Sequence, residues 1–254
     1  NTLIGQASVT SPATNPTEIG EEQAPFIYRL DNPALPASTC ASGLRVDLVL
    51  DTSGSTSGSA TAYNTAAKTF ITSLSGTPTT LRISSFATTS SPGTVLYDLS
   101  KPADQAAAKA RVDAIYPNNT SGSGTTNWDA ALQDAAVANG DVVVMVTDGN
   151  PTVREGGSGA YANIAFGVAS ANLAKDADRS LAGKQQTILA VGVGTGISVN
   201  NLIAISGPIE GTDYTTAADP GVLADVLRNI TQQICPADLS LTKTGDATVA
   251  PGGT

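Results

Sequence analysis

Between residues 44 and 235, short apolar runs alternate with segments whose apolar residues recur at helical spacing. The run at 142–146 is apolar on both faces, as a central parallel strand should be. The runs at 81–86 and 94–97 flank Ser-Pro-Gly and predict a hairpin, so one edge strand runs antiparallel. Strands are predicted at 44–50, 81–86, 94–97, 142–146, 187–193 and 213–215.

The helical segments complete an α/β pattern. They are predicted at 59–75, 102–116, 126–139, from the end of the loop 149–159 to about 182, at 198–206 and at 222–235. Strands that alternate with helices predict a doubly wound, mostly parallel, Rossmann-like sheet with helices on both faces. Ligands of such sheets bind beyond the carboxyl ends of the strands.

The two ends of the chain lack this pattern. Residues 1–39 are rich in Pro, Thr, Ser and Asn and predict an extended N-terminal arm. The cluster at 26–28 has three interpretations: an added edge strand, a segment that packs on the domain, or a plain linker. Residues 40–235 form the predicted domain. Residues 236–254 are interpreted as a linker and, from the alternation at 238–244, as the opening strand of a following repeat.

The composition of the chain excludes some classes of binding partner and of catalytic site. The net charge of the chain is −9, with 22 acidic and 13 basic residues, which disfavours nucleic acid and anionic membrane surfaces as general partners. No apolar run approaches the ~20 residues of a membrane span, so no direct membrane insertion is expected. The chain contains no histidine. Ser-His-Asp and Cys-His catalysis and His-ligated zinc are therefore excluded.

The two cysteines, Cys40 and Cys235, flank the predicted domain. A disulfide between them would tie its two ends together and, in the chain-entropy model, contribute about 5 kcal/mol. Their placement and an export-like composition favour this pairing, and two free buried thiols are the alternative.

Oxygen-bearing side chains follow two of the predicted strands and open one helix. They are Asp51-x-Ser53-x-Ser55, Thr126 before Asn127, and Asp148-Gly149. Hydroxyls and two carboxylates brought to one sheet edge suit a hard divalent cation. Each part also has a simpler interpretation: Ser53, Ser55 or Ser57 caps the helix at 59 or forms hydroxyl turns, Thr126 forms a capping box with Asp129, and Asp148-Gly149 is an ordinary turn. Thr125 stays an alternative to Thr126.

Together these three motifs resemble the metal-ion-dependent adhesion site of von Willebrand factor type A domains, over roughly residues 44–235. The resemblance implies that Ser53, Ser55 and Thr126 coordinate the cation and that Asp51 and Asp148 bind it directly or through water. The ion implied is Mg²⁺ or Mn²⁺, and one coordination position is left for a carboxylate of a ligand.

The resemblance further implies an extracellular, secreted or cell-surface adhesion module of a longer bacterial surface or pilus-tip protein, with a protein or glycan ligand and no enzyme activity. The tail is similar to the first strand of the Ig-like repeats that follow such domains. The alternatives are a metal-dependent hydrolase and a metal-stabilised structural or assembly domain. Trp128 is interpreted as a core anchor or a rim contact, and Arg154 as a solvated charge or a residue that steers an acidic partner.

Overall fold

The computed structural model describes residues 2–4, 27–35, 43–117, 124–176, 178 and 184–235. Within this part of the chain lies a seven-stranded sheet in the order β5-β4-β3-β7-β8-β9, with β6 also paired to β4. Its strands are β3 (Arg45–Asp51), β4 (Thr80–Phe86), β5 (Ser90–Ser91), β6 (Leu96–Asp98), β7 (Val142–Thr147), β8 (Thr187–Val193) and β9 (Tyr214–Ala217).

The predicted fold class is confirmed. Strands β4, β3, β7, β8 and β9 are mutually parallel along the sheet, while β5 and β6 pair antiparallel with β4. Two short segments therefore share the antiparallel edge for which the sequence predicts a single strand. The parallel strands end at one edge of the sheet, where Asp51 closes β3 and Asp148 follows β7.

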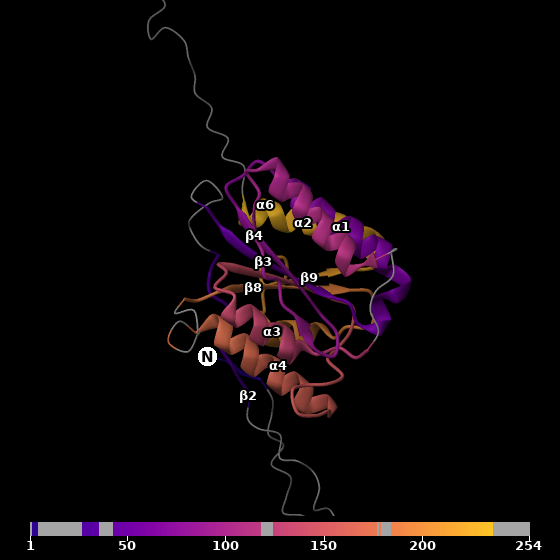
Figure 1. Cartoon of the computed structure of the whole chain (residues 1–254). Coiled ribbons are helices and arrows are strands. Elements are labelled where there is room, and N and C mark those ends of the chain that lie inside the picture. The colour runs from indigo at the N-terminus through magenta and orange to yellow at the C-terminus, as the bar shows by residue number, and fades with distance from the viewer. Residues whose placement is uncertain are drawn as a thin grey trace, which may run out of the picture.

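Helices cover both faces of the sheet (Figure 1). Two separate apolar clusters fill the space between helices and sheet: the first involves α1, α2 and α6, and the second involves α3, α4 and α5. The helices are α1 (Ala60–Leu74), α2 (Pro102–Ile115), α3 (Trp128–Val137), α4 (Ala160–Lys175), α5 (Val199–Ile205) and α6 (Leu223–Ile234). Short 3-10 segments, η2 (Gly54–Ser59) and η4 (Pro220–Val222), precede α1 and α6. None of the helices in the described ranges has the length and apolar character needed to cross a membrane.

Two predicted helix boundaries are wrong. The fourth predicted helix ends at Lys175 rather than near 182, because Asp176 has an extended backbone and the returning chain donates Gln186 N–H to the carbonyl of Ala174. The third begins at Trp128 rather than at 126, because Asn127 caps it by accepting a hydrogen bond from the backbone N–H of Ala130 at 3.0 Å.

Part of the predicted N-terminal arm packs on the domain. Strands β1 (Thr2–Ile4) and β2 (Ile27–Arg29) form an antiparallel two-stranded sheet, and β2 lies beside α4 (Figure 1). Leu30 then donates its N–H to Asn172 of α4 at 2.9 Å. The Asn32 side chain exchanges two 2.9 Å hydrogen bonds with the backbone of Ile188 in β8. Residues 27–34 therefore pack on the domain and do not form a free linker.

The predicted disulfide and the predicted following repeat lie partly or wholly outside the described residues. Cys235 directly follows α6, whereas Cys40 and residues 236–254 are outside the described ranges. Both therefore stay predictions.

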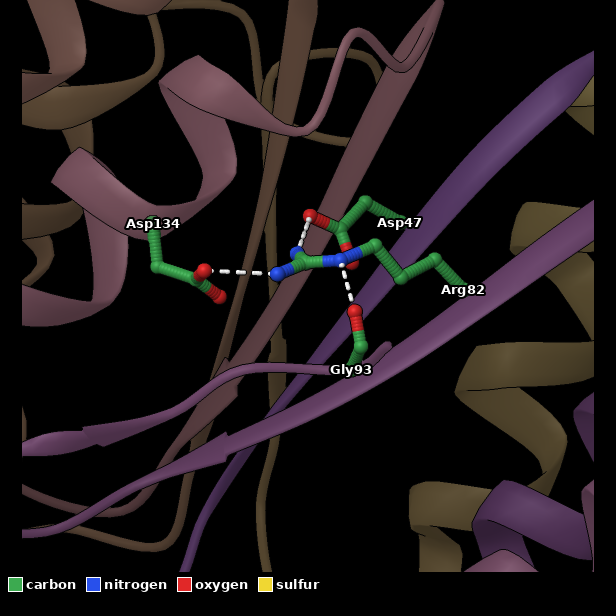
Figure 2. A network of polar contacts seen from close by, with 4 residues as sticks. All are labelled: Asp47, Arg82, Gly93 and Asp134. Carbon is green, nitrogen blue, oxygen red and sulfur yellow. Dashed lines mark hydrogen bonds and ion pairs between the residues drawn. The ribbon is translucent and has the colours of Figure 1, made fainter. Parts of the chain in front are cut away.

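A buried polar network fastens α3 to the sheet (Figure 2). Arg82 on β4 donates to Asp47 on β3 at 2.7 Å, to Asp134 on α3 at 2.6 Å and to the carbonyl of Gly93 at 2.8 Å. Because α3 begins next to Thr126, this network also fixes one side of the predicted metal site.

Candidate metal site

Asp51 forms the deepest part of the site. It is fully buried at the end of β3, and its carboxylate accepts hydrogen bonds from the backbone N–H of Ser53 at 2.8 Å and the hydroxyl of Thr147 at 2.6 Å. Burial raises the pKa of Asp51 to about 6, and the hydrogen bonds from Ser53 and Thr147 oppose that rise. The carboxylate is therefore held in one orientation, with little water to solvate it.

Ser53, Ser55 and Asp148 form a continuous hydrogen-bonded row from the interior to the surface. The hydroxyls of Ser53 and Ser55 lie 3.1 Å apart, and Ser55 donates to a carboxylate oxygen of Asp148 at 2.6 Å. Ser53 is buried, Asp148 is partly buried and Ser55 is exposed. Burial also raises the pKa of Asp148, and the hydrogen bond from Ser55 opposes that rise. Two segments far apart in sequence thus meet at one sheet edge.

Thr126 completes the set. A methyl group added to Gly149 would lie 4.0 Å from both the Thr126 hydroxyl oxygen and the Ser55 hydroxyl oxygen, so the two hydroxyls flank the same glycine. Thr125, the alternative, instead donates its hydroxyl to Thr88 at 3.1 Å. The structure therefore places Thr126, and not Thr125, among the other predicted ligands.

The helix-capping interpretations of these hydroxyls do not match the structure. Ser53 and Ser59 stand at the N-caps of η2 and α1, yet neither side chain makes a capping hydrogen bond. Thr126 does not form the predicted capping box, because Asn127 supplies the cap of α3. These hydroxyls therefore do not cap a helix, and those of Ser53 and Ser55 lie instead in the hydrogen-bonded row that reaches Asp148.

Two residues that hold Asp51, Thr147 and Tyr116, were not predicted as part of the site. Thr147 donates to the Asp51 carboxylate and accepts a 3.4 Å hydrogen bond from the indole N–H of Trp128. Tyr116, beyond α2, donates its hydroxyl to the backbone carbonyl of Asp51 at 2.8 Å. Thr147 directly precedes Asp148 in the sequence and could have been found from that position, whereas no sequence signal pairs Tyr116 with Asp51. Trp128 is fully buried, so its core interpretation holds and its rim interpretation does not.

The loop that follows Asp148 is also anchored. The side-chain oxygen of Asn150 accepts hydrogen bonds from the backbone N–H of Ser198 at 3.0 Å and from Asn201 at 2.8 Å. Its amide donates to the carbonyl of Gly196 at 3.2 Å. Asn150 therefore joins the Asp148 loop to the turn that leads into α5.

The assembled side chains fit a hard divalent cation. They offer two carboxylates and three hydroxyls, all oxygen donors, which Mg²⁺ and Mn²⁺ prefer. Within the described ranges there is no cluster of three or more His, Cys, Asp or Glu, so any ion here depends on the hydroxyls. The charge of Asp148 also adds to the rise in the pKa of Asp51. A cation would relieve this repulsion between the buried carboxylate of Asp51 and the partly buried one of Asp148.

Comparisons with known proteins come from sequence and structure. A family model described as the von Willebrand factor type A domain matches residues 46–229. The comparison with curated proteins finds no match. Three similar solved structures are the D319A mutant of the PilB minor pilin from Streptococcus sanguinis, the vWF domain of the type V pili tip protein Mfa5 from Porphyromonas gingivalis, and proximal thread matrix protein 1 from the mussel byssus with a zinc-occupied MIDAS motif.

The extent of each likeness differs. The PilB mutant is 15% identical with a TM-score of 0.60, over 76% of this chain and 61% of its own. The Mfa5 domain is 14% identical with a TM-score of 0.58, and the match covers 76% of this chain and 95% of the Mfa5 chain. The byssus protein is 20% identical with a TM-score of 0.52, and the match covers 75% of this chain and 46% of the byssus chain. At these identities the likeness shows a shared fold, and this chain spans less than two thirds of the PilB and byssus chains.

Proposed function

Because the chain belongs to the von Willebrand factor type A domain family, we propose that it is an extracellular adhesion module of a longer surface protein. In this proposal it binds an acidic group of a protein or glycan ligand through Mg²⁺ or Mn²⁺. The side chains that would hold the ion are Asp51, Ser53, Ser55, Thr126 and Asp148.

The observation that carries the proposal is the hydrogen-bonded row from Ser53 through Ser55 to Asp148, next to the buried Asp51. A bound cation would supply positive charge and a coordination position for a ligand carboxylate. The similar structures include a minor pilin, a pilus tip protein and a byssus protein with a zinc-occupied MIDAS motif, and these likenesses add support.

The proposed ligands differ in burial, and their roles differ accordingly. Asp51 is buried and held by Thr147, so it can balance charge from behind the ion. Ser55 is exposed and Asp148 is partly exposed, so they line the side that a ligand reaches. Neutral hydroxyls donate less charge than carboxylates would, which leaves the ion attractive to an additional carboxylate.

The first experiment measures ion binding without a ligand. The melting temperature of the chelator-treated protein should rise on addition of Mg²⁺ or Mn²⁺, since ion at about 100 times its dissociation constant adds about 2.7 kcal/mol. Asp148→Ala should abolish this rise. Asp225→Ala, which removes an exposed carboxylate on α6, serves as the matched control and should keep it. Equal stabilisation of the wild type and Asp148→Ala would contradict the proposed ligand set.

The second experiment tests adhesion. Immobilised matrix proteins and glycans are screened with Mg²⁺ and again with chelator, using the wild type and Asp148→Ala. Binding that needs both the ion and Asp148 supports the proposal. Ion-dependent stabilisation without any ion-dependent ligand would instead favour a structural role of the metal.

A further inference from the structure

A tight turn presents Arg154 next to the predicted metal site. Its backbone N–H and carbonyl pair with Gly157 at 2.9 and 3.2 Å, and Gly156 adopts a φ of 78°, which glycine accommodates without strain. Just before the turn, the N–H groups of Thr152 and Val153 both donate to the carbonyl of Thr126, at 2.8 and 3.2 Å. The position of Arg154 is therefore fixed relative to a predicted ligand of the ion.

The guanidinium of Arg154 is oriented by its neighbours but has no anionic partner among the described residues. Its central carbon lies 4.7 Å from the centre of the Phe166 ring, a cation–π arrangement. A methyl group on Gly157 would lie 2.7 Å from one of its terminal nitrogens, so the group rests closely against that glycine. Its Nε is buried and has no hydrogen-bond partner in this part of the chain. An ordered, partly exposed cation is thus available to an outside acceptor.

The adjoining surface of α4 is apolar. Tyr161 and Phe166, in its first two turns, are 47% and 40% exposed. The only charged residue in this 16-residue helix is Lys175, which is buried at the far end. Because β7 and β8 are parallel, α4 runs back from the sheet edge that carries Asp148, so its first turns lie at that edge. Arg154 and Phe166, which lie in contact, are called the Arg154 surface.

We propose that the Arg154 surface is a second contact area for the ligand and that the ligand is an acidic polypeptide segment. This inference rests on the proposed function of the metal site. One carboxylate of the segment completes the ion, a second pairs with Arg154, and an apolar or aromatic side chain packs on Phe166. Arginine pairs with carboxylates in a planar, two-bond geometry, and exposed aromatics are typical anchors of protein interfaces.

Charge complementarity points to this partner. With a net charge of −9, most of this chain repels an acidic segment, so attraction has to be local. The ion and Arg154 supply two positive positions at one edge. The uncharged start of α4 then suits a side chain from a polypeptide better than a uniformly polar ligand.

The test compares two synthetic polypeptides as probes, poly-glutamate and a random copolymer of glutamate and tyrosine, on the whole chain with Mg²⁺. The wild type should bind the copolymer more tightly than poly-glutamate. Arg154→Gln and Phe166→Ala should each weaken copolymer binding about tenfold, the scale of a moderate interface anchor. Both should leave the affinity for Mg²⁺ unchanged. The matched control is Arg228→Gln, which replaces an exposed arginine on α6. This variant should bind the copolymer like the wild type.

The outcomes separate this inference from the proposed function. If chelator abolishes binding while both variants bind the copolymer like the wild type, the Arg154 surface is refuted and the metal site stands. If chelator and Asp148→Ala have no effect on binding, the proposed function itself fails. A wild type that prefers a sialylated glycan to both polypeptides, or an Arg154→Gln variant that loses Mg²⁺ affinity, also overturns the inference.

Discussion

Arg82 offers a test of what holds α3, and with it one wall of the predicted metal site, against the sheet. Its guanidinium makes three hydrogen bonds of 2.6–2.8 Å that reach β3, α3 and the loop at Gly93 (Figure 2). The side chains of Arg82, Asp47 and Asp134 are only 7%, 1% and 8% exposed. Arg82→Met keeps much of the side-chain length and removes all three bonds.

The expected penalty is large because two carboxylates are left buried without their cation. One oxygen of Asp47 and one of Asp134 already have no hydrogen-bond partner among the described residues. Loss of one member of a buried ion pair costs about 3–5 kcal/mol, a large part of the roughly 5–15 kcal/mol that stabilises a domain. The melting temperature should therefore fall by about 6–20 °C.

The penalty should also depend on pH in a defined direction. Burial raises the pKa of Asp47 to about 7, and the charge of Arg82 opposes that rise. Without Arg82 the pKa of the folded state rises further, while that of the unfolded state keeps its ordinary value. A folded carboxyl group with a raised pKa loses its stabilising contribution as pH rises through that pKa. The penalty of Arg82→Met should thus be larger at pH 8 than at pH 5.

The assay is urea denaturation at pH 5 and pH 8, followed by the fluorescence of Trp128, the only tryptophan. Arg228→Met, which removes an exposed ion pair, is the control and should change the midpoint little. The triple variant Asp47→Leu, Arg82→Met, Asp134→Leu should recover much of the lost stability, because none of the three charges stays buried. A penalty below about 1 kcal/mol, or one equal at both pH values, would refute the reasoning.

Three further changes test other parts of the structure. Thr147→Val removes the hydroxyl that holds Asp51, so calorimetric titration should show Mg²⁺ affinity lowered about 10- to 100-fold with an unchanged circular dichroism spectrum. Gly167→Leu should lower the free energy of unfolding by about 1–3 kcal/mol in urea, since even a methyl group there would lie 3.3 Å from Cβ of Trp128. Burial lowers the pKa of Lys175 from 10.5 to about 7, so the unfolded state binds the proton more tightly above pH 7. Stability should therefore gain about 2 kcal/mol between pH 7 and 9, and Lys175→Met should remove this gain in chemical denaturation at the two pH values.

The sheet and the grouping of the polar motifs follow from local sequence. The run Val142–Thr147 is apolar on both faces, which specifies a central strand, and parallel strands must end at one edge. Asp51 and Asp148 each follow such a strand, so their approach is predictable without knowing any side-chain contact. The same reasoning places Thr126 there, at the start of the helix that precedes β7.

What the sequence could not predict depends on distant partners. The end of α4 is set by a hydrogen bond from Gln186, which belongs to the returning chain. The docking of the N-terminal segment relies on Asn32, which pairs with the backbone of Ile188. The hydroxyl of Tyr116 reaches the carbonyl of Asp51 across the fold. In each case the partners are far apart in the sequence, so local propensity does not reveal the contact.

The site also divides physically into a buried and an exposed half. Asp51 is held from the core by Thr147 and Tyr116, whose contacts no ligand can reach. Arg154 lies on the surface turn that follows Thr152 and Val153, which donate to the backbone carbonyl of Thr126. Arg154 is linked to the predicted ion ligands through backbone hydrogen bonds, whereas Thr147 contacts the Asp51 side chain directly. We therefore expect ion affinity and ligand choice to vary independently. A variant at Thr147 should therefore weaken binding of every acidic ligand equally, whereas a variant at Arg154 should change the ranking of ligands at constant ion affinity.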